Sequence, residues 1–222
     1  MIEYDKDAIV PPYITKWLRD NTKEEDTQLI KMREYAKNNG VPIAEPETAK
    51  FLSVITSIIK PEKVLEIGTA IGYSSIVMAR AMGNKGKIIT LEYSEEMVGL
   101  AKENINEAGL EQIIDVREAD AKDYLSYFDE DGWVDMIFLD GPKAHYYYML
   151  DDCVRLLKSG GVLISDNVLY KGMTADDNHI IRRKATIVDR LRDYIDALVN
   201  HKELETTLLP LGDGVTVSIK KG

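Results

Sequence analysis

From residue 64 onward, short apolar runs alternate with stretches of helical periodicity, and this alternation constrains the fold more than any other feature. The apolar runs span residues 64–67, 87–92, 113–120, 134–140 and 161–166. The helical stretches between them span residues 73–82, 95–108, 121–129 and 145–158. Such alternation is typical of βαβ units that build a mostly parallel sheet with helices on both faces. We therefore predict a doubly wound, Rossmann-like α/β fold.

The last part of the chain departs from this alternation. A long amphipathic helix is predicted around residues 178–200, and two apolar runs follow it at 206–211 and 215–219. The short connection Gly212-Asp-Gly214 between these runs predicts an antiparallel hairpin.

The first part of the chain reads as a helical N-terminal addition, residues 1–40, whose helical pattern begins at Thr22 and stops at Gly40. A further helix is predicted from Pro46 until Pro61 ends it. No linker or change in composition divides the chain, so we expect a single domain over residues 1–222.

Composition excludes several classes of protein. With 222 residues, 45% apolar and 30% charged, the chain can build a full core and is not a disordered protein. Its formal net charge of −10 argues against a protein that coats nucleic acid nonspecifically. No apolar run is long enough to span a membrane and the N-terminus lacks a signal-peptide layout, so we expect a cytoplasmic protein. The single cysteine, Cys153, is expected to pack in the core.

Ligands of open α/β sheets bind outside the carboxyl ends of the strands. The first run leads into Glu66-Ile-Gly68-Thr-Ala-Ile-Gly72-Tyr-Ser74, which fits neither a dinucleotide fingerprint nor a phosphate loop. A carboxylate followed by a glycine-lined helix N-terminus instead suits an amino-acid zwitterion, with Glu66 for the ammonium and Ser74 and the loop amides for the carboxylate. The alternative is that both glycines merely shape a tight turn.

The next two strand ends add acidic residues. Glu92 lies about 20 residues past the glycine loop, where an acidic residue holds ribose hydroxyls in nucleoside-binding folds. The alternative is that Glu92 is simply an exposed glutamate at the end of a strand. Asp120 suits an adenine amino group or, equally, a cap for the next helix. An amino acid joined to an adenosine is S-adenosylmethionine, which we predict as the cofactor.

The fourth and fifth strand ends carry oxygen ligands. Asp140 ends one run and Asp166-Asn167 end the next, with Lys143 close by. Two carboxylates and an amide oxygen without thiolate or imidazole favour Mg²⁺, with Mn²⁺ or Ca²⁺ as alternatives, over Zn²⁺. The alternative is that Asp140 pairs with Lys143 while Asp166 and Asn167 form an Asx turn.

Together these residues resemble the cation-dependent class I O-methyltransferases, the family of the catechol and caffeoyl-CoA enzymes. The matching elements are the Glu66–Ser74 loop, Glu92, the Asp140-x-x-Lys143-x-x-Tyr146 run, Asp166-Asn167 and the Gly212-Asp-Gly214 hairpin, in that order. The resemblance implies that Asp140, Asp166 and Asn167 bind the metal and that Lys143 is the catalytic base, with His145 as a rival. It also implies a set of cofactor contacts: Val41, Glu66, Gly68, Gly72, Tyr73, Ser74, Glu92, Asp120, Ala121 and Asp140.

Within that family the chain is most similar to the bacterial tRNA 5-hydroxyuridine methyltransferases. The similarity lies in Asp166-Asn-Val-Leu-Tyr-Lys-Gly-Met173, in Arg182-Arg-Lys184 and in the chain's last residues. It implies methylation of the 5-hydroxyl of the wobble uridine to 5-methoxyuridine, since that hydroxyl and the C4 carbonyl chelate a metal as a catechol does. The anticodon loop is then the expected partner, bound by Tyr146, Lys171, Arg182, Arg183 and Lys184, and a homodimer is expected.

Two alternatives to the tRNA substrate stay open. One is the same chemistry on a small catechol or phenolic acceptor, and the other is a cofactor-binding module without catalysis. The basic segment from Lys171 to Arg192 has a net charge of +3 by residue type, which suits phosphates but is equally typical of a solvated helix face.

Overall fold

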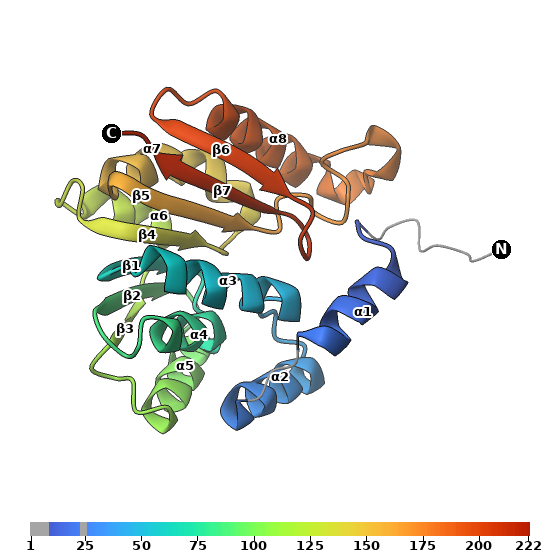
Figure 1. The fold of residues 1–222 in the computed structure, drawn as a ribbon. Coiled ribbons are helices and arrows are strands. Elements are labelled where there is room, and N and C mark those ends of the chain that lie inside the picture. The colour runs from blue at the N-terminus through green and yellow to red at the C-terminus, as the bar shows by residue number, and fades with distance from the viewer. Residues whose placement is uncertain (1–8, 23–25) are drawn as a thin grey trace.

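A seven-stranded sheet in the order β3-β2-β1-β4-β5-β7-β6 forms the centre of the protein, as a computed structural model describing residues 9–22 and 26–222 shows (Figure 1). Only β7 runs antiparallel to its neighbours, so the predicted mostly parallel sheet with a C-terminal hairpin is confirmed. The strands are β1 Lys63–Ile67, β2 Lys87–Glu92, β3 Ile114–Glu118, β4 Val134–Leu139, β5 Leu157–Asp166, β6 Leu204–Leu209 and β7 Val215–Lys220.

Helices cover both faces of this sheet. One hydrophobic cluster joins α2, α3, α4 and α5 to the first face, and a second joins α6, α7 and α8 to the other. The helices are α1 Pro12–Asn21, α2 Thr27–Asn39, α3 Pro46–Ile59, α4 Tyr73–Ala81, α5 Glu95–Glu107, α6 Ala121–Tyr127, α7 Tyr146–Leu156 and α8 Ala185–Val199, with 3-10 turns η1 Lys143–His145, η2 Asp177–His179 and η3 Arg182–Lys184. No helix among the described residues is long and apolar enough to cross a membrane.

The core explains why the central strands read as unbroken apolar runs. Strands β1 and β4 are covered on both faces, so nearly all their side chains are buried. Cys153 packs in the second cluster as predicted, where burial raises the pKa of its thiol to about 12.

Several predicted boundaries differ from the structure: α2 begins at Thr27 rather than Thr22, and β6 spans Leu204–Leu209 rather than 206–211. Two further differences have a local cause. The sequence Ser159-Gly-Gly161 does not end a helix, because α7 stops at Leu156 and these residues form an irregularity inside β5, between its pairings of Leu157 and Val162 with β4. The helix predicted from residue 178 begins only at Ala185. Extended backbone at Ile180 and Ile181 interrupts it, and the 3-10 turns η2 and η3 lie before it.

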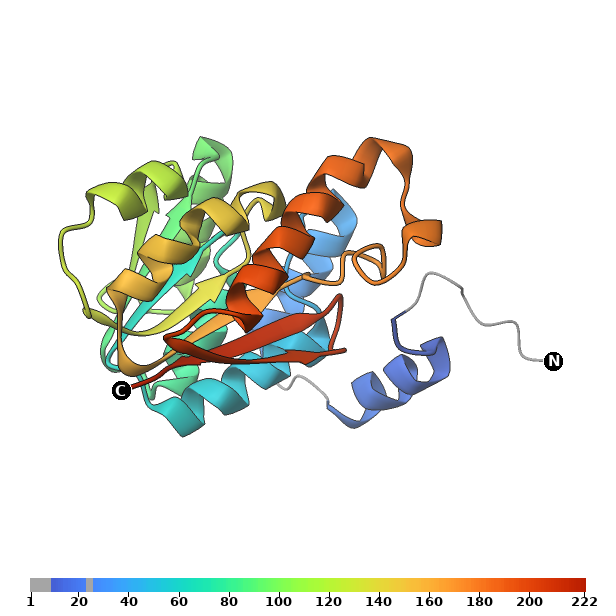
Figure 2. The same ribbon diagram turned by 90° about the horizontal axis from the view of Figure 1, so that it is seen from above.

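The N-terminal addition contains two helices in its described part. Asp26 caps α2 by accepting hydrogen bonds from the amides of Gln28 and Leu29, and Gly40 ends the helix in the left-handed conformation. Helix α1 has no buried residue and stands apart from the sheet (Figure 2). Residues 1–8 and 23–25 of the predicted addition lie outside the described residues.

Candidate active site

A cavity of about 940 Å³ opens at the carboxyl ends of β1, β2, β4 and β5. Strand order reverses between β1 and β4, and this switch point is where ligands of doubly wound sheets bind. The loop 42–47, the turn 210–213 and one side of α1 complete the wall.

Gly68 sets how closely the loop after β1 approaches the end of β4. Its φ is +100°, and a Cβ at this position would lie 2.3 Å from the carbonyl oxygen of Asp140. A residue with a side chain does not fit here. The glycine predicted for close backbone approach therefore brings the glycine loop against the strand end that carries Asp140.

Glu66 lies behind the cavity wall rather than on it, which differs from its expected position facing an ammonium. Its side chain is fully buried, and its carboxylate accepts hydrogen bonds from Ser74 Oγ (2.5 Å), Thr90 Oγ1 (2.6 Å) and the hydroxyl of Ser75. These donors occupy both carboxylate oxygens. Glu66 therefore orients the hydroxyls around it, and Ser74 is the member of the cluster that lines the cavity.

Burial raises the pKa of Glu66 to about 7, and its hydroxyl partners oppose part of that rise. The pKa of Glu66 is thus higher in the folded protein than in the unfolded chain, so a rise in pH favours the unfolded chain, in which Glu66 ionises first. The free energy of unfolding should therefore fall as pH rises from about 4.5 to about 7, by up to about 3 kcal/mol. We expect Glu66→Gln to remove this slope. Urea unfolding at several pH values measures it, with the exposed Glu111→Gln as control; an unchanged slope in Glu66→Gln would contradict the assignment.

The other predicted cofactor contacts divide into two groups. Tyr73, Ser74, Glu92, Asp120 and Ala121 line the cavity together with Gly68 and Asp140, whereas Val41 and Gly72 are not among its lining residues.

The carboxylates of Glu92 and Asp120 are held by backbone amides. Glu92 accepts from the amide of Ala70 at 2.9 Å and from the amides of Tyr93 and Ser94, which fixes its carboxylate at the end of β2. Asp120 caps α6 through the amide of Lys122, so the capping interpretation holds although the residue also reaches the cavity.

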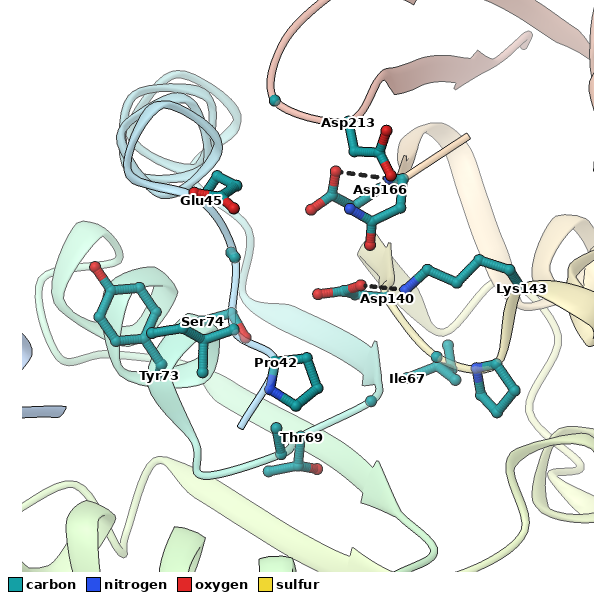
Figure 3. Close-up of a pocket in the computed structure, with 18 of the residues that line it drawn as sticks. Pro42, Glu45, Ile67, Thr69, Tyr73, Ser74, Asp140, Lys143, Asp166 and Asp213 are labelled. Atoms are coloured by element: carbon teal, nitrogen blue, oxygen red, sulfur yellow. Dashed lines mark hydrogen bonds and ion pairs between the residues drawn. The ribbon is translucent and has the colours of Figure 1, made fainter. Parts of the chain in front are cut away.

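Asp140 and Asp166 lie on the same side of the cavity, at the ends of the neighbouring strands β4 and β5 (Figure 3). Lys143 Nζ donates to Asp140 Oδ1 at 2.9 Å, and Asp166 Oδ1 accepts from the amide of Asn167 at 2.7 Å. Both local interactions named as the alternative are present. They leave the second oxygen of each carboxylate without a hydrogen bond from the described residues.

The surroundings of these two carboxyl groups raise the pKa of both. Burial raises the pKa of Asp140, and Lys143 opposes the rise. Burial also raises the pKa of Asp166, and the charge of Asp140 raises it further. Two neighbouring carboxylates that repel each other, one buried and one partly buried, fit a divalent cation. The described residues contain no group of three or more histidine, cysteine or acidic side chains arranged to hold a metal, so the predicted set rests on two carboxylates and Asn167.

The hairpin turn between β6 and β7 holds the loop that carries Asn167. The amides of Val168 and Leu169 donate to the carbonyls of Gly214 and Asp213, and the amide of Lys171 donates to Asp213 Oδ1 at 2.5 Å. A Cβ at Gly214 would lie 2.4 Å from Leu169 Cγ, so the turn fits the loop only with glycine. Asp213 thus adds a third carboxylate to this side of the cavity, and burial raises its pKa.

Sequence reasoning missed Asp213 as a site residue, although the motif containing it was noted. It also missed a charged cluster in the cavity wall, in which Arg19 of α1 forms ion pairs with Glu47 Oε2 at 2.8 Å and Glu45 Oε2 at 2.7 Å. These three residues line the cavity. No local motif marks them, because α1 and the loop before α3 meet only in the folded chain.

The predicted substrate residues are divided by the structure. Lys171 lines the cavity, as does the rival base His145, and the η3 residues 182–184 lie outside the core without a buried member. The expected contact of Tyr146 with the anticodon loop does not fit the structure, because its ring is fully buried against Tyr194 and its hydroxyl donates to the carbonyls of Leu139 and Asp166.

The geometry agrees with the comparisons. The family model for O-methyltransferases matches residues 20–221. A catechol O-methyltransferase of Niastella koreensis is 33% identical over 74% of this chain and 76% of its own length, and a caffeoyl-CoA O-methyltransferase of Petroselinum crispum is 31% identical over 77% and 73%.

Solved structures show the same fold. A putative caffeoyl-CoA O-methyltransferase from Staphylococcus aureus matches with a TM-score of 0.85 and 31% identity over 94% of this chain and 99% of that one. An O-methyltransferase from Bacillus cereus in complex with SAH matches with a TM-score of 0.83 and 27% identity over 94% and 97%. With a family model that spans nearly its whole length, and a cavity at the switch point of its sheet, this chain belongs to the O-methyltransferase family.

Proposed function

We propose that this protein transfers a methyl group from S-adenosylmethionine to the 5-hydroxyl of 5-hydroxyuridine at the wobble position of tRNA, with the help of a divalent cation. The observation that carries the chemistry is the acid pair at the switch-point cavity, buried Asp166 and partly buried Asp140, with Lys143 hydrogen-bonded to the carboxylate of Asp140.

The cofactor half of the cavity supports S-adenosylmethionine. Ser74 at the first turn of α4 and the loop amides suit the amino-acid end, and Glu92 suits the ribose hydroxyls. The similar Bacillus cereus enzyme was solved with SAH, the product of this cofactor.

The acidic half suits the acceptor. Asp140, Asp166 and Asn167 would hold the cation, and an acceptor with two neighbouring oxygens, such as 5-hydroxyuridine or a catechol, would chelate it. When bound, the cation lowers the pKa of the acceptor hydroxyl and the cofactor supplies the methyl group. Lys143 lies beside Asp140 and, as the neutral amine, would take the proton that the hydroxyl releases. The rigid strand ends align the acceptor oxygen with the methyl carbon, so that the new O–C bond forms as the S–C bond breaks.

The tRNA acceptor is supported by basic residues near the site: Lys171 lines the cavity, and Arg182 and Arg183 are exposed on η3. A small catechol or phenolic acceptor is the second candidate, because the curated relatives include catechol and caffeoyl-CoA enzymes.

One labelling experiment tests both acceptors. The protein is incubated with methyl-labelled S-adenosylmethionine and Mg²⁺, or with EDTA, and with either tRNA containing 5-hydroxyuridine or catechol. We expect Mg²⁺-dependent label in the tRNA. Label only in catechol would replace the tRNA proposal with the second candidate, and label in neither would contradict methyl transfer.

Replacing Lys143 with methionine should lower kcat about a hundredfold at saturating cofactor, because the released proton then lacks its acceptor. The pH–rate profile should lose the limb that reports the base. His145→Asn is the matched test of the rival base, and Lys85→Met is a surface control. A normal profile in Lys143→Met together with a lost limb in His145→Asn would assign the base to His145.

A further inference from the structure

Exposed or partly exposed tyrosines and basic side chains gather next to the cavity, on the side of the sheet covered by α6, α7 and α8. We call this set the cation–tyrosine rim and define it as Lys122, Tyr147, Tyr148, Tyr170, Lys184 and Arg190. Its members come from α6, α7, α8, η3 and the loop after β5, segments that lie side by side at the carboxyl ends of the strands.

The centre of the rim is Tyr148 with one cation on either neighbouring helix. The guanidinium of Arg190 lies 5.6 Å from the ring centroid of Tyr148, and the ammonium of Lys122 lies 5.8 Å from it. Such contacts place cations on a rigid surface without neutralising them. Lys122 also lines the cavity, so the rim begins at the site itself.

A second pair repeats the arrangement beside η3. The ammonium of Lys184 lies 5.7 Å from the ring centroid of Tyr170, one residue before the cavity residue Lys171. Each of the two cation–tyrosine groups therefore contains or directly precedes a residue that lines the cavity, Lys122 in the first and Lys171 after the second.

The rim cations keep their charge available. Within the described chain, Lys122, Lys184 and Arg190 form no ion pair. Two acids of the same segments pair with other residues, Asp177 with Arg192 and Asp152 with Arg155. Asp123 and Asp189 are exposed next to Lys122 and Arg190 in the chain. In a chain of net charge −10, a stretch of unneutralised cations is a local feature that favours an anionic partner.

An aromatic surface accompanies the charge. Tyr147 is 47% exposed and packs edge-on against Tyr148 at 5.7 Å between ring centroids, which leaves much of its own ring uncovered. Alternating cations and open aromatic rings are how proteins hold single-stranded nucleic acid, with phosphates on the cations and bases stacked on the rings.

We propose that the cation–tyrosine rim binds the single-stranded anticodon loop beside the reacting nucleotide, with backbone phosphates at Lys122, Arg190 and Lys184 and a neighbouring base on Tyr147. This inference rests on the proposed tRNA substrate. It also assigns the stacking role to Tyr147, in place of the buried Tyr146.

The test measures binding of a synthetic anticodon stem-loop RNA by fluorescence anisotropy across a range of salt concentrations. The double variant Lys184→Gln/Arg190→Gln should weaken binding about 20-fold at 0.1 M salt and reduce the log–log salt slope by about 1.4, which corresponds to two lost phosphate contacts. Tyr147→Ala should weaken binding about tenfold with an unchanged salt slope, since stacking is not ionic.

Matched controls come from the opposite end of the sheet. Lys85 is an exposed lysine just before β2, and Tyr127 is an 85% exposed tyrosine at the last turn of α6. Lys85→Gln and Tyr127→Ala should bind the RNA like the wild type. Thermal unfolding of every variant shows whether each one is folded.

The outcomes separate the rim from the proposed function. If the wild type methylates tRNA and the rim variants bind and methylate it equally well, the rim is overturned while the tRNA function stands. If the wild type methylates catechol but no tRNA, both the proposed tRNA acceptor and the proposed RNA-binding role of the rim are contradicted. If the ratio of kcat/KM on tRNA to that on the free nucleoside falls in the rim variants alone, the inference is supported.

Discussion

Replacing Asp166 with alanine is expected to abolish cation-dependent methyl transfer, with kcat/KM at least about a thousandfold lower. The reason is that Asp166 supplies one of only two carboxylates proposed to bind the cation. Loss of a residue that only supports a metal ligand typically lowers metal affinity or activity 10- to 100-fold, and loss of a ligand itself should cost more. Cofactor binding, measured by isothermal titration calorimetry, should survive, because Asp166 lies at the end of β5 and is not among the residues proposed to contact the cofactor, such as Ser74 and Glu92.

A second readout does not depend on activity. Asp166→Asn keeps the shape of the side chain and an acceptor for the Asn167 amide but removes the charge that opposes Asp140. In EDTA this variant should therefore unfold at a higher temperature than the wild type, and Mg²⁺ should stabilise the wild type more than the variant. The exposed Asp129→Ala is the control. Full activity of Asp166→Ala with EDTA present would refute the cation role.

Replacing Gly68 with alanine should have the largest effect on stability. The added Cβ would lie 2.3 Å from the Asp140 carbonyl oxygen, and the backbone at φ +100° is strained for any residue with a side chain. Overpacking and backbone strain together should cost about 4 kcal/mol. For a chain of this length that corresponds to a fall in melting temperature of about 10 °C.

The same substitution should also disturb the site, because the clash pushes the end of β4 away from the glycine loop. We expect weaker cofactor binding by calorimetry in addition to the lower melting temperature. Gly83→Ala is the matched control, since Gly83 also has positive φ but no atom lies within 4 Å of its hypothetical Cβ. Equal losses in the two variants would mean that backbone strain alone, and not the contact with Asp140, accounts for the effect.

The prediction of the fold succeeded where local periodicity decides structure. The central residues of β1, β2 and β4 are covered on both faces of the sheet and are mostly apolar, so the positions of these strands are visible in the chain. The boundaries around Ser159-Gly-Gly161 and before Ala185 failed because local signals were ambiguous: two glycines suit a helix end and a strand irregularity equally well.

Most of the residues predicted at strand ends line the cavity in the structure, whereas residues that reach it through neighbours from elsewhere in the chain were not predicted. Asp140 and Asp166 meet because β4 and β5 are adjacent. Glu66 was expected at the ligand, yet hydroxyls from α4 and β2 occupy its carboxylate. Arg19 and Asp213 reach the cavity from segments distant in the chain, which no motif announces.

By itself, the amino-acid sequence determined the sheet, the strand ends that meet at the switch point and the family, since these follow from periodicity and from motifs that are short and local. Only the tertiary structure decided which polar groups face the cavity and which are enclosed behind it, as the contrast between exposed Tyr147 and buried Tyr146 illustrates. The physical reason is that exposure and hydrogen-bond partners depend on packing between elements, and adjacent residues of the same type can differ completely in both.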